Sequence, residues 1–304
     1  MSAFHPDLAV GRFIPKVWIG PRLTRVVKNR AVRTPAAPDD ILVEEVTAPG
    51  VSLRIYRPRS LEGAAPALFW MHGGGYLMGT PEQDEATNIA FARGLGITVA
   101  AVRYRLAPTH AAPAAVEDAY AGLLWLVRNA GARGIEPARI AVGGASAGGG
   151  LAAALALYAH DRGEVRPVFQ LLVYPMLDDR TVLRTDIDTR NVRVWTPRSN
   201  RYSWTSYLGQ APGTAGVSPY AAPARREDLA GLPPAWIGVG SLDLFHDEDV
   251  EYARRLTEAG VPCELSVVPG AFHGFDSIFR GAAVSHEFHE EQARALRAAL
   301  STSP

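Results

Sequence analysis

The sequence predicts an α/β fold: a mostly parallel central sheet with helices on both faces. Short apolar runs alternate along the chain with segments of helical periodicity. The run at 168–174 is almost continuously apolar, which is typical of a strand buried on both faces. With 304 residues, 47% of them hydrophobic and 20% charged, the chain is long enough to bury a large core. We expect a single domain that spans residues 1–304.

The expected strands are short apolar runs, several of them bounded by glycine or proline. The first two, 41–46 and 51–57, are separated by Pro49-Gly50 and predict a hairpin. The remaining strands are expected at residues 67–71, 97–102, 139–143, 168–174, 235–239 and 264–268. The expected helices cover residues 82–95, 116–127, 147–160, 247–259 and 286–300.

Two segments interrupt this alternation. Residues 1 to about 40 precede the first strand, and residues from about 178 to 225 separate two core strands. The second segment is rich in Trp, Tyr, Arg and Pro, and connections of this length are usually functional. We expect the two segments together to form a helical cap over the carboxyl edge of the sheet, where such folds bind ligands.

The strongest chemical signal is Gly144-Ala145-Ser146-Ala147-Gly148, which matches G-x-S-x-G. It lies between an expected strand and an expected helix, the setting in which this motif presents a nucleophilic serine on a sharp turn. Glycines on either side allow the strand and the helix to approach closely, and the helix N-terminus favours developing negative charge. The alternative is an ordinary glycine turn, which the strand–turn–helix setting disfavours. Ser146 is therefore the candidate nucleophile.

A second signal is His72-Gly73-Gly74-Gly75, directly after the strand that ends at Met71. Consecutive glycines let the backbone fold tightly and turn successive N–H groups into one cavity. Together with the N–H of Ala147, they would make an oxyanion hole. A phosphate-binding loop is disfavoured, because no G-K-[ST] or G-x-G-x-x-G pattern follows. We expect His72 to brace this loop.

Asp243 and His273 each follow a later expected strand. The order Ser, Asp, His is that of an α/β-hydrolase triad, in which imidazole accepts the serine proton and the carboxylate orients the imidazole. Three further acids, Asp247, Glu248 and Asp249, follow Asp243 and are alternatives to it. They fall in the first turn of the next helix, where the helix dipole favours acids, so Asp243 is preferred.

With these motifs placed, the chain resembles the hormone-sensitive-lipase-like family of α/β-hydrolases, in its bacterial esterase branch. The resemblance extends from about Arg57 to the last helix. It rests on the segments 72–75, 104–108 (Tyr-Arg-Leu-Ala-Pro), 113–119, 144–149, 174–175 (Tyr-Pro) and 272–275 (Phe-His-Gly-Phe), in that order. It implies that Gly74, Gly75 and Ala147 donate to the oxyanion. The chain departs from the family at Ala145, where Asp or Thr is frequent, and at Leu244, where Pro is common.

These observations together predict a serine carboxylesterase that acts through an acyl-enzyme. The resemblance implies esters of short to medium acyl chains. Four aromatic residues of the expected cap are candidates for the walls of the pocket, although packing of the cap on the domain explains them equally well. They are Trp195, Tyr202, Trp204 and Tyr207. Activity should fall below neutral pH as His273 becomes protonated.

The sequence is also compatible with other functions. The same triad serves amidases, arylformamidases and peptidases. Some relatives bind ligands without catalysis, but that alternative is disfavoured because Ser146, Asp243 and His273 are all present. A lipase acting on aggregated lipid is disfavoured by the arginine-rich segment 180–201.

We expect a small-molecule ester substrate and no metal or cofactor, because no H-E-x-x-H motif and no Cys/His cluster occurs. The 31 basic and 31 acidic residues cancel, so neither nucleic acid nor membrane is an expected partner. The single cysteine and the absence of a signal sequence suggest a cytoplasmic protein. A homodimer is expected only by analogy with relatives that pair through an edge strand.

Overall fold

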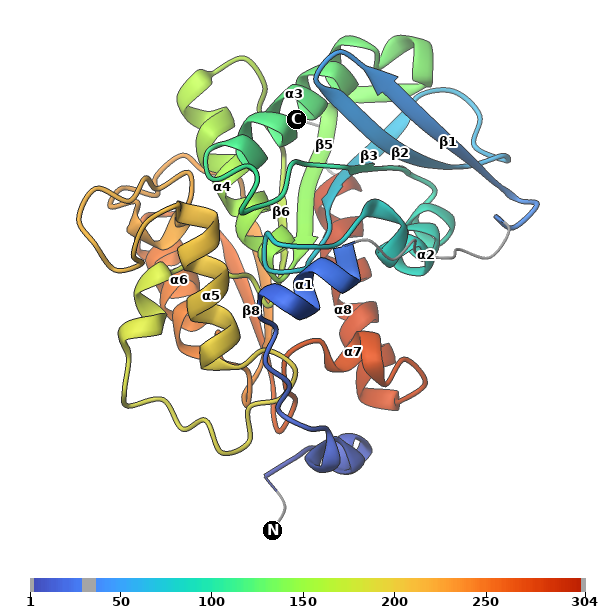
Figure 1. Ribbon diagram of the computed structural model, residues 1–304. Coiled ribbons are helices and arrows are strands. Elements are labelled where there is room, and N and C mark those ends of the chain that lie inside the picture. Colours follow the sequence, from blue (N-terminus) through green and yellow to red (C-terminus); the bar gives the residue numbers. More distant parts are fainter. Residues whose placement is uncertain (1–2, 29–36, 302–304) are drawn as a thin grey trace.

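The computed structural model describes residues 3–28 and 37–301. Eight strands form one sheet in the order β1-β2-β4-β3-β5-β6-β7-β8 (Figure 1). β1 and β2 form an antiparallel hairpin, β2 pairs antiparallel with β4, and all later pairings are parallel. The strands are β1 (Ile41–Ala48), β2 (Val51–Pro58), β3 (Ala65–Met71), β4 (Thr98–Val102), β5 (Ile135–Ala145), β6 (Gln170–Val173), β7 (Ala235–Gly240) and β8 (Cys263–Val268).

Helices follow most of the parallel strands. The α-helices are α1 (Pro21–Lys28), α2 (Glu85–Leu95), α3 (Ala114–Arg128), α4 (Ala147–Arg162), α5 (Pro197–Leu208), α6 (His246–Glu258), α7 (Phe275–Ile278) and α8 (Ala283–Ser301). Short 3₁₀-helices are η1 (Pro6–Phe13), η2 (Pro81–Asp84), η3 (Gly131–Arg133), η4 (Asp179–Leu183) and η5 (Pro223–Arg225).

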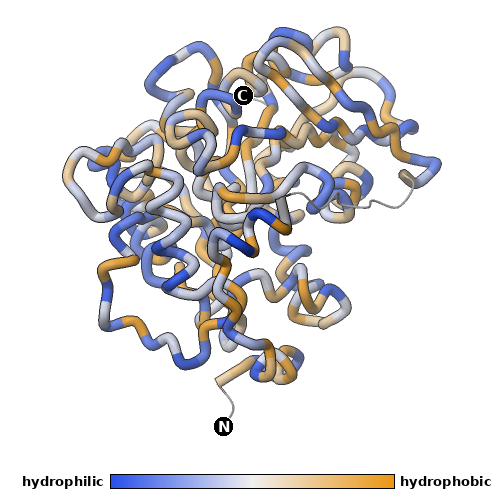
Figure 2. The backbone as a smooth tube through the Cα atoms, in the orientation of Figure 1, coloured by the Kyte–Doolittle hydropathy of each residue, from blue (hydrophilic) through white to orange (hydrophobic). Residues whose placement is uncertain are grey.

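The core has two layers, one on each face of the sheet. Along β3, Phe69 and Met71 point into the layer that contains α3, α4 and α6, whereas Leu68 and Trp70 point into the layer that contains α2 and α8. This alternation follows from the period of two in a strand. In Figure 2 the β1–β2 hairpin alternates between hydrophobic and hydrophilic residues, as expected of strands with a partly exposed face.

The predicted sheet with helices on both faces is confirmed, and β1 and β2 pair antiparallel across Pro49-Gly50, as the predicted hairpin requires. Most element ends differ from the prediction by one to three residues, and three differences have a clear local cause. β5 begins at Ile135, because Ile135 already pairs with Ala65 ahead of a register shift. β6 is only Gln170–Val173, because Tyr174 turns out of the strand at φ +37°. The helix expected from residue 82 begins as the 3₁₀-turn η2 and becomes α-helical at Glu85.

The two segments expected to form the cap lie against each other. The Ile19 N–H donates to Ser199 Oγ over 3.0 Å, Arg198 stacks on Trp18 at 3.7 Å, and Lys16 donates to the carbonyl of Thr189. Figure 1 shows the same proximity, with the blue N-terminal segment running beside α5. Residues 1–2 and 29–36 of the expected cap lie outside the described residues.

Candidate active site

Ser146 lies on the sharp turn between β5 and α4, as the motif predicts. Its backbone has φ +58° and ψ −120°, a conformation that costs energy in any residue other than glycine. The turn is possible because the residues two positions before and after Ser146, Gly144 and Gly148, have no side chain. A Cβ on Gly144 would lie 2.3 Å from the carbonyl oxygen of Gly148, and one on Gly148 would lie 2.1 Å from that of Met71. The motif glycines are therefore steric requirements of this turn.

A chain of hydrogen bonds joins Ser146 to His273 and His273 to Asp243. Nε2 of His273 lies 2.9 Å from Ser146 Oγ, and Nδ1 lies 2.8 Å from Asp243 Oδ2. The other carboxylate oxygen of Asp243 accepts from the N–H of Phe245 over 3.0 Å. Because a carboxylate can only accept, Nδ1 carries a proton and Nε2 is free to accept from the serine hydroxyl. All three residues are buried.

The topology of the sheet explains why Ser146, Asp243 and His273 lie close together. Ser146 follows β5, Asp243 follows β7 and His273 follows β8, and these strands run parallel. Their carboxyl ends therefore share one edge of the sheet, at which the glycine loop after β3 also emerges. Residues 97 and 30 positions apart in sequence thus come within hydrogen-bond distance.

Three aromatic rings surround the imidazole of His273. Tyr174 lies edge-to-face at 4.9 Å between ring centroids, Phe245 lies perpendicular at 5.2 Å, and Trp195 is at 6.4 Å. They come from the end of β6, from the loop after β7 and from the insertion at 178–225. Their packing restrains the ring in directions that the two in-plane hydrogen bonds leave free.

Hydrogen bonds to successive carbonyl groups hold the glycine loop after β3. His72 Nδ1 donates to the Gly73 carbonyl over 2.8 Å, and the Gly74 carbonyl accepts from the N–H groups of Leu77 and Met78 at 3.1 and 3.2 Å. In a trans peptide the N–H points opposite to the carbonyl. These bonds therefore fix the directions of the Gly74 and Gly75 N–H groups. Ala147, as the first residue of α4, also has an N–H without an intrahelical acceptor.

His72 acts as a neutral brace in this loop. Burial lowers the pKa of His72 to about 4, so the ring is uncharged at neutral pH. It stacks on Tyr104 at 4.3 Å, and the Tyr104 hydroxyl donates to the His72 carbonyl over 2.7 Å. Because a carbonyl oxygen can only accept, the neutral His72 ring carries its proton on Nδ1.

The insertion at 178–225 reaches this loop through Trp195 and Ser203. The Ser203 hydroxyl donates to the Gly75 carbonyl, and a Cβ on Gly75 would lie 2.2 Å from the Trp195 ring. Of the four aromatic residues expected at the pocket, Trp195 thus contacts both the glycine loop and His273. Trp204 and Tyr207 are fully buried and pack with Tyr76, whose ring stacks on Tyr207 at 3.8 Å. Tyr202 is partly buried against the core.

Two of the acids considered as alternatives to Asp243, Asp247 and Glu248, have partners other than His273. Asp247 pairs with His246 and Arg184. Glu248 is buried and accepts from the N–H groups of Leu177 and Asp178, and from the Thr181 hydroxyl. Glu248 thus secures the beginning of the insertion, and burial raises its pKa.

Sequence reasoning did not assign a role to Tyr174, Ser203 or Asp276, each of which contacts the residues described above. Tyr174 touches His273, and its hydroxyl donates to Asp276 Oδ1 over 2.9 Å. The available signal was the Tyr174-Pro175 pair, which occurs among the motifs of the resemblance. Ser203 carried no signal, because its contact with Gly75 depends on how the insertion packs.

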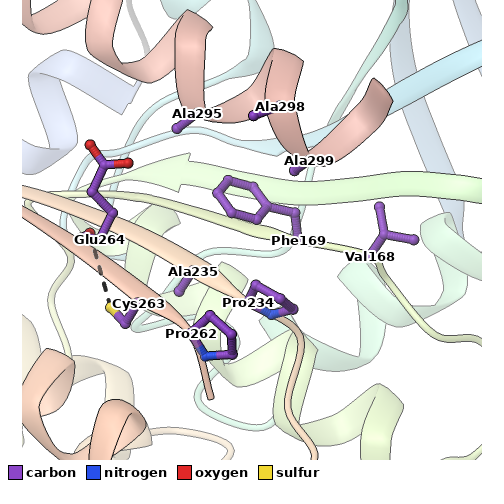
Figure 3. A pocket seen from close by; sticks show the side chains of 10 residues that line it. All are labelled: Val168, Phe169, Pro234, Ala235, Pro262, Cys263, Glu264, Ala295, Ala298 and Ala299. Carbon is purple, nitrogen blue, oxygen red and sulfur yellow. Dashed lines mark hydrogen bonds between the residues drawn. The ribbon is translucent and has the colours of Figure 1, made fainter. Parts of the chain in front are cut away.

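A separate cavity of about 460 Å³ lies at the opposite edge of the sheet (Figure 3). Its lining comes from the starts of β6, β7 and β8 and from the end of α8, including Phe169, Ala235, Cys263 and Ala295. Burial raises the pKa of the Cys263 thiol to about 12, so it is a poor nucleophile at neutral pH. This cavity is remote from Ser146, because the triad lies at the carboxyl ends of the same strands.

Residues 3–28 and 37–301 contain no group of three or more His, Cys, Asp or Glu side chains arranged to hold a metal ion. Nor do they contain a helix with the length and apolar character needed to cross a membrane.

Comparison with known proteins places the chain in a family. The model of a family described as having the alpha/beta hydrolase fold matches residues 68–277. Carboxylic ester hydrolase LipN of Mycobacterium tuberculosis is 37% identical over 85% of this chain and 71% of its own length. Ethyl acetate hydrolase of Pseudomonas putida is 34% identical over 73% of this chain and 70% of its own length. A solved structure titled bacterial heroin esterase superposes with a TM-score of 0.88, at 39% identity over 99% of both chains.

The chain belongs to the α/β-hydrolases. Within that fold it belongs to the hormone-sensitive-lipase-like family, as its motifs indicated, alongside bacterial esterases.

Proposed function

We propose that this protein is a serine carboxylesterase in which Ser146 attacks the ester carbonyl, His273 is the general base and Asp243 orients the imidazole. The observation that carries the proposal is the hydrogen-bonded chain from Ser146 through His273 to Asp243 on the strained turn after β5. A serine hydroxyl is a weak nucleophile until a base accepts its proton, and this geometry supplies that base. The relatives named as esterases support the choice of an ester bond.

The reaction has two steps. Ser146 Oγ bonds to the carbonyl carbon while His273 Nε2 takes its proton, which then passes to the leaving alcohol as the ester C–O bond breaks. Water, deprotonated by the same Nε2, then attacks the acyl-enzyme and releases the carboxylic acid, and the proton returns to Ser146. Asp243 stabilises the imidazolium that forms in each step.

Negative charge develops on the carbonyl oxygen in both steps, and Gly74, Gly75 and Ala147 are proposed to donate to it. Support comes from the carbonyl bonds of Gly73 and Gly74, which fix the directions of the first two N–H groups before substrate arrives. Donors already oriented need no reorganisation in the transition state, and each is typically worth about a hundred- to a thousandfold in rate.

The segments 1–40 and 178–225 are proposed to form the cap, and Trp195 to line the pocket within it. Trp195 is presented by a strained turn, because the preceding Val194 has φ +65°, which is unusual for a β-branched residue. Its ring lies against Gly75 and near His273, so it borders the position of the reacting carbonyl. Such a bulky wall limits the space beside the carbonyl and favours short to medium acyl chains. Tyr202, Trp204 and Tyr207 are assigned to packing of the cap.

Hydrolysis of p-nitrophenyl esters from acetate to palmitate tests this proposal. Ser146→Ala should lose nearly all turnover, while Ser285→Ala, which removes a buried hydroxyl of α8 that makes no hydrogen bond within the described residues, should retain it. We expect a maximum at short to medium chains. The matching p-nitroanilides should react much more slowly. Faster turnover of the anilides would point to an amidase, and turnover that survives Ser146→Ala would overturn the triad.

A further inference from the structure

The imidazole of His273 must stay between two partners during two proton transfers. Its bonds to Ser146 and Asp243 act at the ring nitrogens. The loop before it is tied to the end of β7, since the Gly270 N–H donates to Ser241 Oγ and the Leu242 N–H donates to the Ala271 carbonyl, both over 2.8 Å. The turn after His273, which begins α7, needs its own attachment.

Tyr174 and Asp276 provide that attachment. Asp276 lies three residues after His273, in α7, and is 3% exposed. Its Oδ1 accepts the Tyr174 hydroxyl over 2.9 Å, in a bond that joins this turn to the end of β6. The ring of Tyr174 lies edge-to-face with His273 at 4.9 Å and stacks on Phe288 of α8 at 6.3 Å. One side chain therefore contacts the imidazole with its ring and holds the following turn with its hydroxyl.

The backbone of Tyr174 is strained to make this contact. Its φ is +37°, in the region that favours glycine, and its N–H is held by the Gly238 carbonyl over 2.7 Å. Strain in a bulky residue persists only where the surrounding structure imposes it, and it concentrates at functional sites.

We propose that Tyr174 and Asp276 are a positioning pair: their hydrogen bond holds the turn that carries His273 and keeps the imidazole in line between Ser146 and Asp243. This inference rests on the proposed function. The pair acts through His273 and touches no substrate atom.

The Tyr174 hydroxyl keeps its proton over the working pH range, so titration of the phenol does not break its hydrogen bond to Asp276. Burial and the nearby Asp276 carboxylate raise the pKa of the Tyr174 phenol well above its ordinary value, so it stays a donor over the working pH range. Asp276 Oδ2 faces His289 Nε2 of α8 at 3.6 Å. Asp84 of η2 lies near Asp276 within the field of Arg280, and burial raises the pKa of Asp84 to about 6.

The test compares kcat, KM and pH profiles for Tyr174→Phe, Asp276→Ala, Asp276→Asn and the double variant Tyr174→Phe/Asp276→Ala. The net contribution of one buried hydrogen bond corresponds to about a two- to twelvefold change. Tyr174→Phe should lower kcat about tenfold, with KM within about twofold. Asp276→Asn keeps an acceptor oxygen and should stay within about threefold of wild type, and the double variant should match the single variants. Tyr252→Phe, which removes a buried hydroxyl without a hydrogen-bond partner among the described residues, should leave kcat unchanged.

The pH profile separates positioning from electrostatics. Since a neutral phenol carries no charge, Tyr174→Phe should lower the plateau of kcat without moving its acidic limb. Rates are expressed per folded molecule, taken from unfolding curves, so that lost stability is not read as lost catalysis. An unchanged kcat for Tyr174→Phe in an enzyme that Ser146→Ala inactivates would overturn the positioning pair alone. So would an Asp276→Asn variant as slow as Asp276→Ala, or a shifted acidic limb.

Discussion

Gly74→Ala is the sharpest test of the oxyanion loop. Gly74 has φ +116°, and a Cβ there would lie 2.1 Å from the carbonyl oxygen of Met78. Backbone on both sides of this contact must move, and with it the peptides that carry the Gly74 and Gly75 N–H groups. Losing one oriented donor costs about a hundred- to a thousandfold in kcat, or about 3–4 kcal/mol of transition-state stabilisation. The conformation itself adds about 1–3 kcal/mol of strain to the folded state.

Gly50→Ala is the matched control for Gly74→Ala. Gly50 also has positive φ, +71°, but a Cβ there meets no atom within 4 Å, and it lies in the β1–β2 hairpin. It should lose stability and keep kcat. The assay is kcat on p-nitrophenyl butyrate per folded molecule, with stability from urea unfolding. If Gly74→Ala stayed within about threefold of wild type while Ser146→Ala was inactive, the assignment of the loop as oxyanion donor would be refuted.

Three further predictions follow from the structure. Trp195→Ala should raise kcat/KM for longer acyl chains by about fourfold for each additional methylene accommodated, at about 0.8 kcal/mol each, and Trp204→Ala should leave the chain-length profile unchanged. If Trp195→Ala and Trp204→Ala changed the chain-length profile equally, the assignment of Trp195 to the wall of the pocket would be wrong. Burial, followed by the charges of Glu248 and Asp243, raises the pKa of Asp249 well above its ordinary value, so the folded protein holds a proton that the unfolded chain releases. The free energy of unfolding should therefore fall by up to about 1.4 kcal/mol per pH unit as pH rises from the unfolded toward the folded pKa of Asp249. Asp249→Asn should make this fall shallower, and the part that remains comes from Glu248, whose pKa burial also raises. In urea unfolding at pH 5, 7 and 8.5, a stability difference between wild type and Asp249→Asn that does not change with pH would contradict this. Leu265 of the edge strand β8 is 37% exposed, and pairing of β8 with a second copy would cover it. Light scattering should then find a dimer that Leu265→Lys converts to a monomer, and a monomeric wild type at all concentrations would exclude this pairing.

The sequence predicted the triad because its determinants are local. Each candidate follows a predicted strand, and parallel strands bring such positions to one edge. Gly144 and Gly148 are needed because a Cβ at either would collide with backbone, and that requirement is visible as a motif. The positions of Ser146, Asp243 and His273 were thus readable before any contact was known.

The pocket could not be predicted in the same way. Trp195 and Trp204 occur in one aromatic-rich segment, yet the first contacts the glycine loop and the second is buried against Tyr76. Which ring faces the site depends on how the whole insertion packs on the domain. The burial of the acids after Asp243 could not be predicted from the sequence either. Glu248 and Asp249 fit the pattern of a solvated helix start, but the helix presents both of them to the interior.

Backbone strain gives independent support for the site. Within residues 3–28 and 37–301, four residues other than glycine have positive φ: Tyr76, Ser146, Tyr174 and Val194. Ser146 is the candidate nucleophile, Tyr174 touches His273, Tyr76 directly follows the glycine loop, and Val194 presents Trp195. They belong to four different loops, so no single local distortion accounts for them. Strain of about 1–3 kcal/mol at each position must be offset by the rest of the fold. Its concentration in and beside the segments that carry the candidate site is the arrangement expected of a site organised before substrate binds.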